Sequence, residues 1–404
     1  MIQLKKIKVV ELRLGMFLHG FDGPWLKHPF WKSTFLLTEP ADLRAAQQCG
    51  LNECWIDMAR SKQEATTRSE KVQALPLAEP PSTAQANFAV SFEQELSRAR
   101  LICSQARGAT AAMFNEARLG KAIDPDSCLP LIEEITQSVS NNSHALISLV
   151  RLKTNDDYTY MHSVAVCALM VALAKNMGMD ENGCRDAGLA GLLHDLGKAS
   201  LPLEVLNKPG KLSDAEYDMV KRHPQHGHDL LVQSKLANAA VLDVCLHHHE
   251  KIDGSGYPEG LKGDNISLLS RMGALCDVYD AITSNRPYKS GWDPADSIAK
   301  MLSWHGHFDK KVLTAFVKTV GIYPTGSLVK LRSGRLAVVV EQNESAFTKP
   351  IVKVFFSTKS GTRIPIEKID LSGPGEHEGI VGHEPRDKYD AAFIDALWAG
   401  ETSV

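Results

Sequence analysis

Histidine and carboxylate side chains crowd together in the middle of this 404-residue chain, and both are common ligands of divalent metals. Eight of the fifteen histidines lie between His162 and His249. Three of them stand side by side in the segment CLHHHEKIDGSGYPEG, residues 245–260, directly before a glycine-rich turn. Imidazole and carboxylate together suit borderline or hard ions such as Fe, Mn or Zn, so the clustering predicts a metal site.

A His-Asp pair, His194-Asp195, follows the apolar segment AGLAGLL. The two oxygens of a carboxylate can face different ions, so Asp195 could bridge two metals. The pair alone is weak evidence, because a histidine at the C-terminal end of a helix also interacts favourably with the helix dipole. The interpretation as a metal site therefore depends on ligands from elsewhere in the chain.

Further candidate ligands come from other predicted elements. A lone histidine on an apolar helix face, such as His162, is more often a packed core residue. A metal cage inside a helical bundle, however, draws its ligands from several helices. Five separate segments each offer one or two ligands: His162; His194 with Asp195; His223 before Pro224; His248 with His249; and Asp277.

The segments that must position these side chains are predicted to be helices. From about residue 88 to about 320 the apolar residues recur with helical spacing, and strand signals are few. The spacing predicts a helical bundle. We expect helices near 89–118, 158–176, 181–193, 213–222, 225–236, 239–251, 266–285, 294–304 and 309–319.

The two ends of the chain are expected to differ from this bundle. Residues 1–60 combine strand-like and helical patterns, which predicts a small α+β domain, and a polar linker with prolines follows at 61–86. Residues 321–404 alternate apolar and polar positions between turns, which is typical of a small antiparallel β extension. The predicted fold is therefore mainly α, with a helical domain at 87–320 between two smaller units.

The composition is that of an ordinary globular protein, with 44% hydrophobic residues, 23% charged residues and a net charge of -3. Such a balance gives no reason to expect a nucleic acid polymer or an anionic membrane as a partner. The apolar run VAVCALMVALA is too short to span a bilayer, and the N-terminus lacks the pattern of a signal peptide. We therefore expect a cytoplasmic protein whose eight scattered cysteines are free thiols.

Four segments closely resemble the HD-GYP branch of the HD phosphohydrolase superfamily: HDLGK (194–198), KRHPQHG (221–227), HHEKIDGSGYP (248–258) and DVYDAITSNRPYK (277–289). They occur in the family's order, and the resemblance covers roughly residues 140–320. It implies an HD-type helical bundle and a bacterial phosphodiesterase that hydrolyses cyclic di-GMP. The first 60 residues resemble an accessory domain often found before HD-GYP domains.

The resemblance also implies that all the candidate ligands above bind metal, with Asp195 as the bridging carboxylate. Family members with a third metal carry a glutamate four residues before the first ligating histidine, where this chain has Tyr158. We therefore predict two divalent metals, Fe or Mn. Asp157 is one residue away from that position and would point elsewhere on a helix by about 100°.

Two neighbouring metals would lower the pKa of a water and clamp a phosphodiester, so that hydroxide attacks phosphorus in line with the leaving 3′ oxygen. The resemblance implies that Lys198 faces the phosphate and neutralises or protonates the leaving group. It also implies substrate contacts from Arg286 and Lys289, since such cations pair with phosphate or guanine. Each of these three cations could instead be an ordinary solvated residue.

The turn DGSGYP is predicted to hold Tyr257 near the rim of the site, because Pro258 restricts the tyrosine to an extended backbone. Its ring could stack on a guanine of the substrate. The loop could also be a surface for partner proteins, and the resemblance implies GGDEF-domain cyclases. The sequence leaves both roles open.

Three neighbours of the expected ligands receive secondary roles. His247 is rotated by about 100° from His248 on a helix, so we expect a packing or surface residue. Glu250 could hydrogen-bond a ligating histidine. Asp280, one turn after Asp277, is expected to orient a ligand or a lysine.

The favoured hypothesis is hydrolysis of cyclic di-GMP to linear pGpG, with a further step to GMP left open. An alternative keeps the chemistry and changes the substrate to cyclic GMP-AMP, because base discrimination comes from a few pocket contacts. A second alternative is a catalytically weak receptor that senses the nucleotide in signalling. The GYP segment and NRPYK argue against a hydrolase of ordinary nucleotides. The oligomeric state does not follow from the sequence.

Overall fold

The computed structural model describes residues 4–22, 35–38, 43–44, 46–47, 53–58, 60, 91–152, 158–208, 210–236, 238–284, 291–343 and 346–400. The chain divides into two compact units, Met1–Asn87 and Phe88–Val404. Within the described residues, no helix combines the length and the apolar character needed to cross a membrane.

The first unit contains a small antiparallel sheet with the strand order β1-β4-β2-β3. Its core is formed by apolar residues from the strands and from the short 3-10 turn η1, among them Val9, Leu18 and Ile56. The strands and the turn are β1 (Leu4–Lys8), η1 (Val9–Glu11), β2 (Phe17–Asp22), β3 (Phe35–Leu36) and β4 (Glu53–Asp57).

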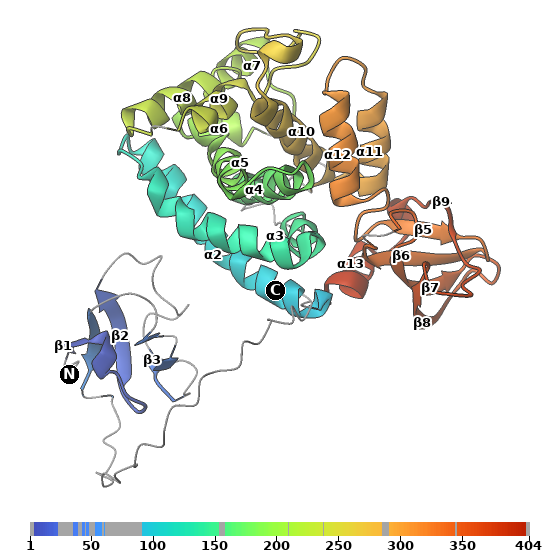
Figure 1. Ribbon diagram of the computed structural model, residues 1–404, viewed down its shortest axis with the longest axis horizontal. Helices are drawn as coiled ribbons and strands as arrows, with labels where there is room; N and C mark the ends of the chain where they lie inside the picture. The colour runs from blue at the N-terminus through green and yellow to red at the C-terminus, as the bar shows by residue number, and fades with distance from the viewer. Residues whose placement is uncertain are drawn as a thin grey trace, which may run out of the picture. The chain divides into compact units, whose positions relative to one another are not determined.

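The second unit begins with a helical body that carries every predicted metal ligand (Figure 1). Its first helix starts at a capping box, in which Ser91 and Gln94 satisfy each other's backbone N–H groups. The helices are α2 (Phe92–Arg118), α3 (Leu129–Val150), α4 (Tyr158–Asn176), α5 (Glu181–Leu193), α6 (Leu203–Leu206), α7 (Asp214–Val220), α8 (His223–Gln233), α9 (Ala239–His247), α10 (Leu268–Thr283), α11 (Pro294–Ser303) and α12 (Lys310–Val320), with 3-10 turns η3 (Pro125–Cys128), η4 (Leu196–Ser200) and η5 (Gly263–Asn265).

Helix α4 lies at the centre of this body and is packed on all sides. Every residue from Met161 to Ala174 is buried, which explains why the run VAVCALMVALA has no polar face. Helix α5 approaches it closely at Gly191, where a Cβ atom would lie 2.9 Å from the backbone of Cys167. The close contact sets the position of the His-Asp pair that follows α5.

The C-terminal part is an antiparallel sheet with the strand order β8-β7-β6-β5-β9. Helix α13 packs against it through Ile394, Leu397 and Trp398. The elements are β5 (Leu328–Leu331), β6 (Arg335–Glu341), β7 (Ile351–Ser357), β8 (Thr362–Asp370), β9 (Ile380–His383), η6 (Arg386–Lys388) and α13 (Ala391–Ala399). The fold class expected from the sequence, mainly α with a small α+β part and a C-terminal antiparallel sheet, is confirmed.

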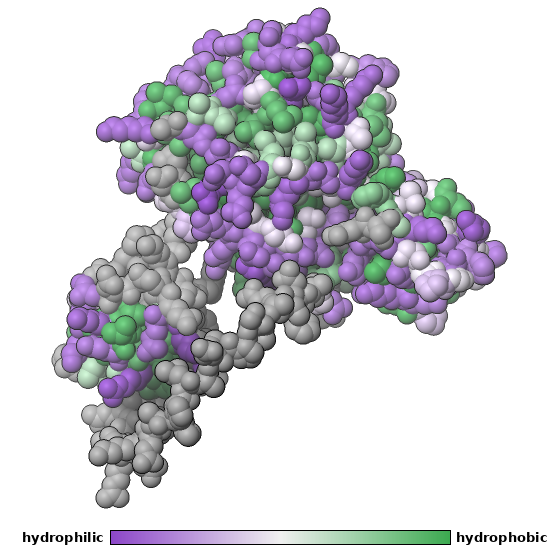
Figure 2. Space-filling view, in the orientation of Figure 1, coloured by the Kyte–Doolittle hydropathy of each residue, from purple (hydrophilic) through white to green (hydrophobic). Residues whose placement is uncertain are grey.

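The sheet is joined to the helical body by a buried cation. Arg151, just after α3, donates to the carbonyl of Thr325 over 3.0 Å and lies 5.7 Å from the Trp398 ring. Hydrophilic side chains predominate on the face shown in Figure 2, and apolar residues gather in patches between them.

Candidate metal centre

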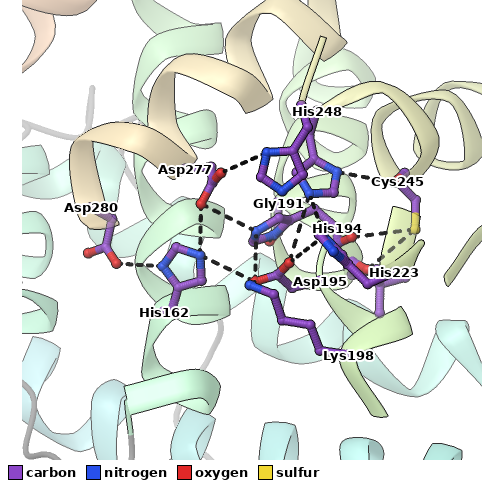
Figure 3. Close-up of polar contacts among 12 residues, drawn as sticks. His162, Gly191, His194, Asp195, Lys198, His223, Cys245, His248, Asp277 and Asp280 are labelled. Atoms are coloured by element: carbon purple, nitrogen blue, oxygen red, sulfur yellow. Dashed lines mark hydrogen bonds and ion pairs between the residues drawn. The ribbon is translucent and has the colours of Figure 1, made fainter. Parts of the chain in front are cut away.

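Seven side chains from five places in the helical body converge on one buried centre (Figure 3). His162 comes from the second turn of α4 and Asp277 from within α10, whereas the others lie at the ends of shorter helices. All are buried except His249, whose side chain is 23% exposed. The converging residues are His162, His194, Asp195, His223, His248, His249 and Asp277.

These side chains form two clusters that share Asp195. One holds His162 and His194, the other holds His223, His248 and His249, and within each cluster the potential ligand atoms lie within 4.8 Å of one another. The shared carboxylate presents a different oxygen to each cluster. Such an arrangement is the geometry that a bridging carboxylate needs.

The distances around Asp195 make this division explicit. Its Oδ2 lies 3.4 Å from the Nε2 atoms of both His162 and His194. Its Oδ1 lies 3.2 Å from His223 Nε2 and 3.8 Å from His248 Nε2. Four imidazole nitrogens therefore face the carboxylate, two on each side.

Asp277 adds a second carboxylate beside the first cluster. Its Oδ1 is 3.0 Å from His162 Nε2 and 3.9 Å from His194 Nε2. Its Oδ2 is 3.8 Å from His249 Nδ1, so the side chain also reaches the second cluster. Each cluster thus has a mixture of imidazole and carboxylate groups.

Three of the histidines are oriented by backbone carbonyls at helix ends. The Nδ1–H groups of His194, His223 and His248 donate to carbonyls three or four residues earlier, over 2.7–3.1 Å. The last carbonyls of a helix have no N–H partner within it, so they are free to accept. Because a carbonyl only accepts, Nδ1 carries the proton and the neutral Nε2 is left with a lone pair for a metal.

His162 needs a different partner because it lies within α4, where the backbone carbonyls already accept from N–H groups of the helix. Its Nδ1 donates to Asp280 Oδ2 over 2.6 Å, and the other oxygen of Asp280 accepts from Ser284 Oγ over 3.1 Å. The carboxylate thereby fixes the ring and turns Nε2 toward Asp195. Asp280 thus contacts His162, the kind of contact expected from its place one turn after Asp277.

Replacing Asp280 by asparagine is expected to weaken metal binding by about 10- to 100-fold, because His162 loses the charged group that orients it and raises its basicity. Metal titration of the apoprotein would measure the change, and excess metal should restore most of the activity. Asp243→Asn is a matched control, since Asp243 holds the neighbouring His247 over 2.8 Å outside the two clusters. Equal metal affinity in the Asp280 variant and the original chain would contradict this role.

Burial sets the charge of the second cluster. It lowers the pKa of His223, lowers that of His248 well below its usual value, and lowers that of His249 to about 3. These imidazoles are therefore neutral near pH 7. Neutral imidazole is the form that binds metal.

In Asp195, Asp277 and His162, neighbouring groups outweigh the effect of burial on the pKa. Burial would raise the pKa of Asp195 and Asp277, but neighbouring cations and hydrogen bonds outweigh it and hold both far below the usual range. Burial would also lower the pKa of His162, but Asp277 and Asp280 outweigh it and raise it. Without a metal, the first cluster is thus held together by the contacts of His162 with the carboxylates of Asp277 and Asp280.

Two buried atoms of the centre make no hydrogen bond within the described residues: Nε2 of His194 and Oδ1 of Asp195. A buried lone pair without a donor is costly, and a divalent ion would satisfy both. The ionised carboxylates, the neutral imidazoles and these two atoms together fit divalent metals.

Lys198 lies beside the shared carboxylate. Its Nζ is 2.5 Å from Asp195 Oδ2, and its side chain is 25% exposed, so the cation sits between the buried cluster and solvent. A phosphate that approached the metals from the open side would meet this amino group.

Tyr257 packs directly on a predicted ligand. Its ring stacks on His249 with 4.7 Å between centroids, and its backbone N–H donates to the His249 carbonyl over 3.2 Å. One ring face is thereby occupied, so any stacking on a substrate base would use the other. Pro258 follows through a cis peptide bond.

Glu250 accepts hydrogen bonds from the backbone of the turn and not from a ligating histidine, contrary to the sequence interpretation. Its Oε1 accepts from the backbone N–H groups of Glu259 and Gly260, over 2.8 and 3.0 Å. The buried carboxylate thus serves as the acceptor for N–H groups that, in an irregular loop, have no partner in a helix or sheet. His247 points away from the clusters to Asp243 and belongs to neither of them.

Several residues singled out from the sequence lie outside the described residues. They are Asp157, the side chain of Tyr158, and the two proposed substrate contacts Arg286 and Lys289. The predictions that concern a third metal and these two cations therefore stay predictions.

Known proteins resemble the chain over most of its length. Residues 132–312 match the HD domain family, and residues 4–128 match a domain of unknown function, DUF3391. The cyclic di-GMP phosphodiesterase PA4108 of Pseudomonas aeruginosa is 51% identical over 98% of this chain and 96% of its own length. The 3'3'-cGAMP-specific phosphodiesterase 1 of Vibrio cholerae is 39% identical over 36% of this chain and 34% of its own length.

Solved structures also align with this fold. The structure of Bd1817, a HDG"Y"P protein from Bdellovibrio bacteriovorus, is 18% identical with a TM-score of 0.46, and the alignment covers 78% of this chain and 98% of that one.

Proposed function

This chain belongs to the HD-GYP branch of the HD phosphohydrolase superfamily, and from that premise we propose that it is a metal-dependent phosphodiesterase that hydrolyses cyclic di-GMP to pGpG. HD phosphohydrolases use divalent metals, and this chain brings together histidines and aspartates that can hold them. The observation that carries the proposal is the shared Asp195, with a histidine cluster on each of its two oxygens. The similarity to PA4108 over nearly the whole of both chains supports the choice of substrate.

In the proposed site, one ion would be held by His162, His194, Asp195 and Asp277, and a second by Asp195, His223, His248 and His249. Iron or manganese suits this donor set. Bound metals would supply Lewis acidity, which lowers the pKa of a water and stabilises charge on phosphate oxygens. Their identity would follow from elemental analysis of protein purified without oxygen.

The chain's own residues would position and protonate the substrate. Lys198 would bind a non-bridging phosphate oxygen and deliver a proton from Nζ to the leaving 3′ oxygen. Arg286 and Lys289 would pair with the second phosphate or with a guanine edge. The free face of the Tyr257 ring would stack on a base, and the same loop would meet a GGDEF-domain partner.

Turnover of defined substrates tests the proposal. Metal-loaded protein is incubated with cyclic di-GMP, 3′3′-cyclic GMP-AMP and pGpG, and the products are separated by chromatography. We expect cyclic di-GMP to be opened to pGpG faster than the mixed dinucleotide is opened. Faster turnover of the mixed dinucleotide would assign the other substrate, and tight binding of both without products would assign a receptor.

A further inference from the structure

A cavity of 360 Å³ lies apart from the metal centre, where α3, α4 and α12 meet the end of β6. None of its lining residues belongs to the metal centre. Its lining is mixed, with polar residues such as Ser140, Thr319 and Asn176 and apolar residues such as Val139 and Ala172. A neighbouring hollow of 440 Å³ shares Asn176 and Lys318 with it. We call these two adjoining cavities together the lysine pocket.

The lysine pocket is positively charged. Lys175 and Lys318 line the 360 Å³ cavity, and Lys310, Lys311 and again Lys318 line the 440 Å³ hollow. Among the described residues, no aspartate or glutamate lines either of them. None of these four amino groups has a described carboxylate within ion-pair distance; Lys175 Nζ donates to Ser140 Oγ over 2.7 Å. Several other lysines of the chain, such as Lys198, Lys208 and Lys221, do pair with carboxylates. Unneutralised cations gathered at a concave surface raise the local concentration of anions.

The backbone of α3 brings the start of a helical segment to the same place. The helix breaks at Asn142, where φ is -161° and ψ is 102°, and Asn142 Oδ1 accepts from the N–H groups of His144 and Ala145. A second helical segment starts there, and its first residues, Ser143 and His144, line the cavity. The positive end of that segment's dipole lies beside the lysines, which reinforces the charge.

An aromatic ring stands at the rim. Phe347 lines the cavity and is 42% exposed, so its ring is accessible to a ligand there. A flat ring next to cations and hydroxyls offers a stacking surface and a phosphate site together.

We propose that the lysine pocket binds a nucleoside monophosphate, with the phosphate on Lys175 and Lys318 and the base on Phe347. Lys175, Lys318 and Phe347 all line the 360 Å³ cavity, whose volume is near the lower end of those found for small-molecule sites and suits one nucleotide. Lys175 lies thirteen residues after His162 on α4, about 20 Å along the helix. A ligand here would therefore not touch the metal centre, although it would contact the helix that supplies His162.

Calorimetric titration of the full chain with GMP tests this proposal. The Asp195→Ala background removes binding at the metal centre, so the remaining binding reports the lysine pocket. We expect saturable binding of GMP there, weakened at least tenfold by the pair Lys175→Gln and Lys318→Gln. The pair Lys121→Gln and Lys359→Gln, two exposed lysines elsewhere, is the matched control and should leave binding unchanged.

Two further arms separate a nucleotide site from a general anion site. Phe347→Ala should weaken GMP binding and leave the binding of inorganic phosphate unchanged. Circular dichroism of each variant shows that the fold is intact. Undiminished GMP binding in the Lys175 and Lys318 pair overturns the proposal, and so does inorganic phosphate binding as tightly as GMP.

Discussion

Replacing Asp195 by alanine is expected to remove bound metal and phosphodiesterase activity together, while the helical content stays that of the original chain. Asp195 is the only described residue that belongs to both clusters, so its loss would remove a ligand from each of the two proposed ions at once. Activity should fall by more than about 10³-fold, because even a single transition-state hydrogen-bond donor accounts for 10²- to 10³-fold. Metal content per chain and initial rates of cyclic di-GMP hydrolysis are the two measurements.

The same substitution also removes the buried carboxylate that pairs with Lys198. A lower melting temperature is therefore expected as well, since breaking a buried charge pair leaves the other charge uncompensated. Asp218→Ala is the matched control, because Asp218 is an exposed aspartate whose partner is Lys221. An Asp195 variant that keeps both metals, or that keeps its activity, would contradict the bridging role.

The elements that carry the centre could be predicted from their apolar residues to within a few residues. The apolar runs that predict helices at 158–176 and 181–193 correspond to α4 (Tyr158–Asn176) and α5 (Glu181–Leu193). Helix α4 is recognised by its long apolar run and not by a repeat, because it is buried on all sides. The boundary near His223 was wrong: a helix was expected to begin at 225, after Pro224, yet His223 begins α8. The N–H groups in the first turn of a helix have no partner within the helix. Proline has no N–H, so it fits the start of a helix as well as the residue after its end.

The orientation of the ligands could not be predicted from residue types. The partners of His194, His223 and His248 are backbone carbonyls, which every residue has, so no sequence letter marks them. A signal existed only in position, because all three were placed near helix ends, where free carbonyls occur. Glu250 shows the same limit, since its partners are backbone N–H groups of a loop nine and ten residues later.

The glycine of the segment HDLGK has a structural reason that the sequence does not reveal. Gly197 lies in η4, and a Cβ atom there would be 1.9 Å from the carbonyl oxygen of His223 and 2.4 Å from the N atom of Gly227. Both contacts are with the backbone of α8, which cannot rotate away as a side chain can. The absence of a side chain at Gly197 therefore sets how closely α8 approaches Asp195.

Gly197→Ala is accordingly expected to push α8 away and to separate His223 from Asp195. Metal ligands tolerate only about 0.2 Å of error, so the second ion should be lost first while the first cluster still binds. Metal content should fall from two ions per chain toward one, and activity should fall by about 10²-fold or more, as a displacement of 1 Å can cause. The melting temperature should also fall, because overpacking costs about 1–3 kcal/mol.

The matched control separates this steric effect from the general effect of a methyl group. Gly108 lies within α2, and a Cβ atom there would meet nothing within 4 Å. Gly108→Ala should therefore keep both metals and raise stability by up to about 1 kcal/mol, the difference in helix propensity. If Gly197→Ala keeps two ions and full activity, the contact between η4 and α8 does not fix His223. If it loses both ions together, the two clusters depend on one another more closely than their separate ligands suggest.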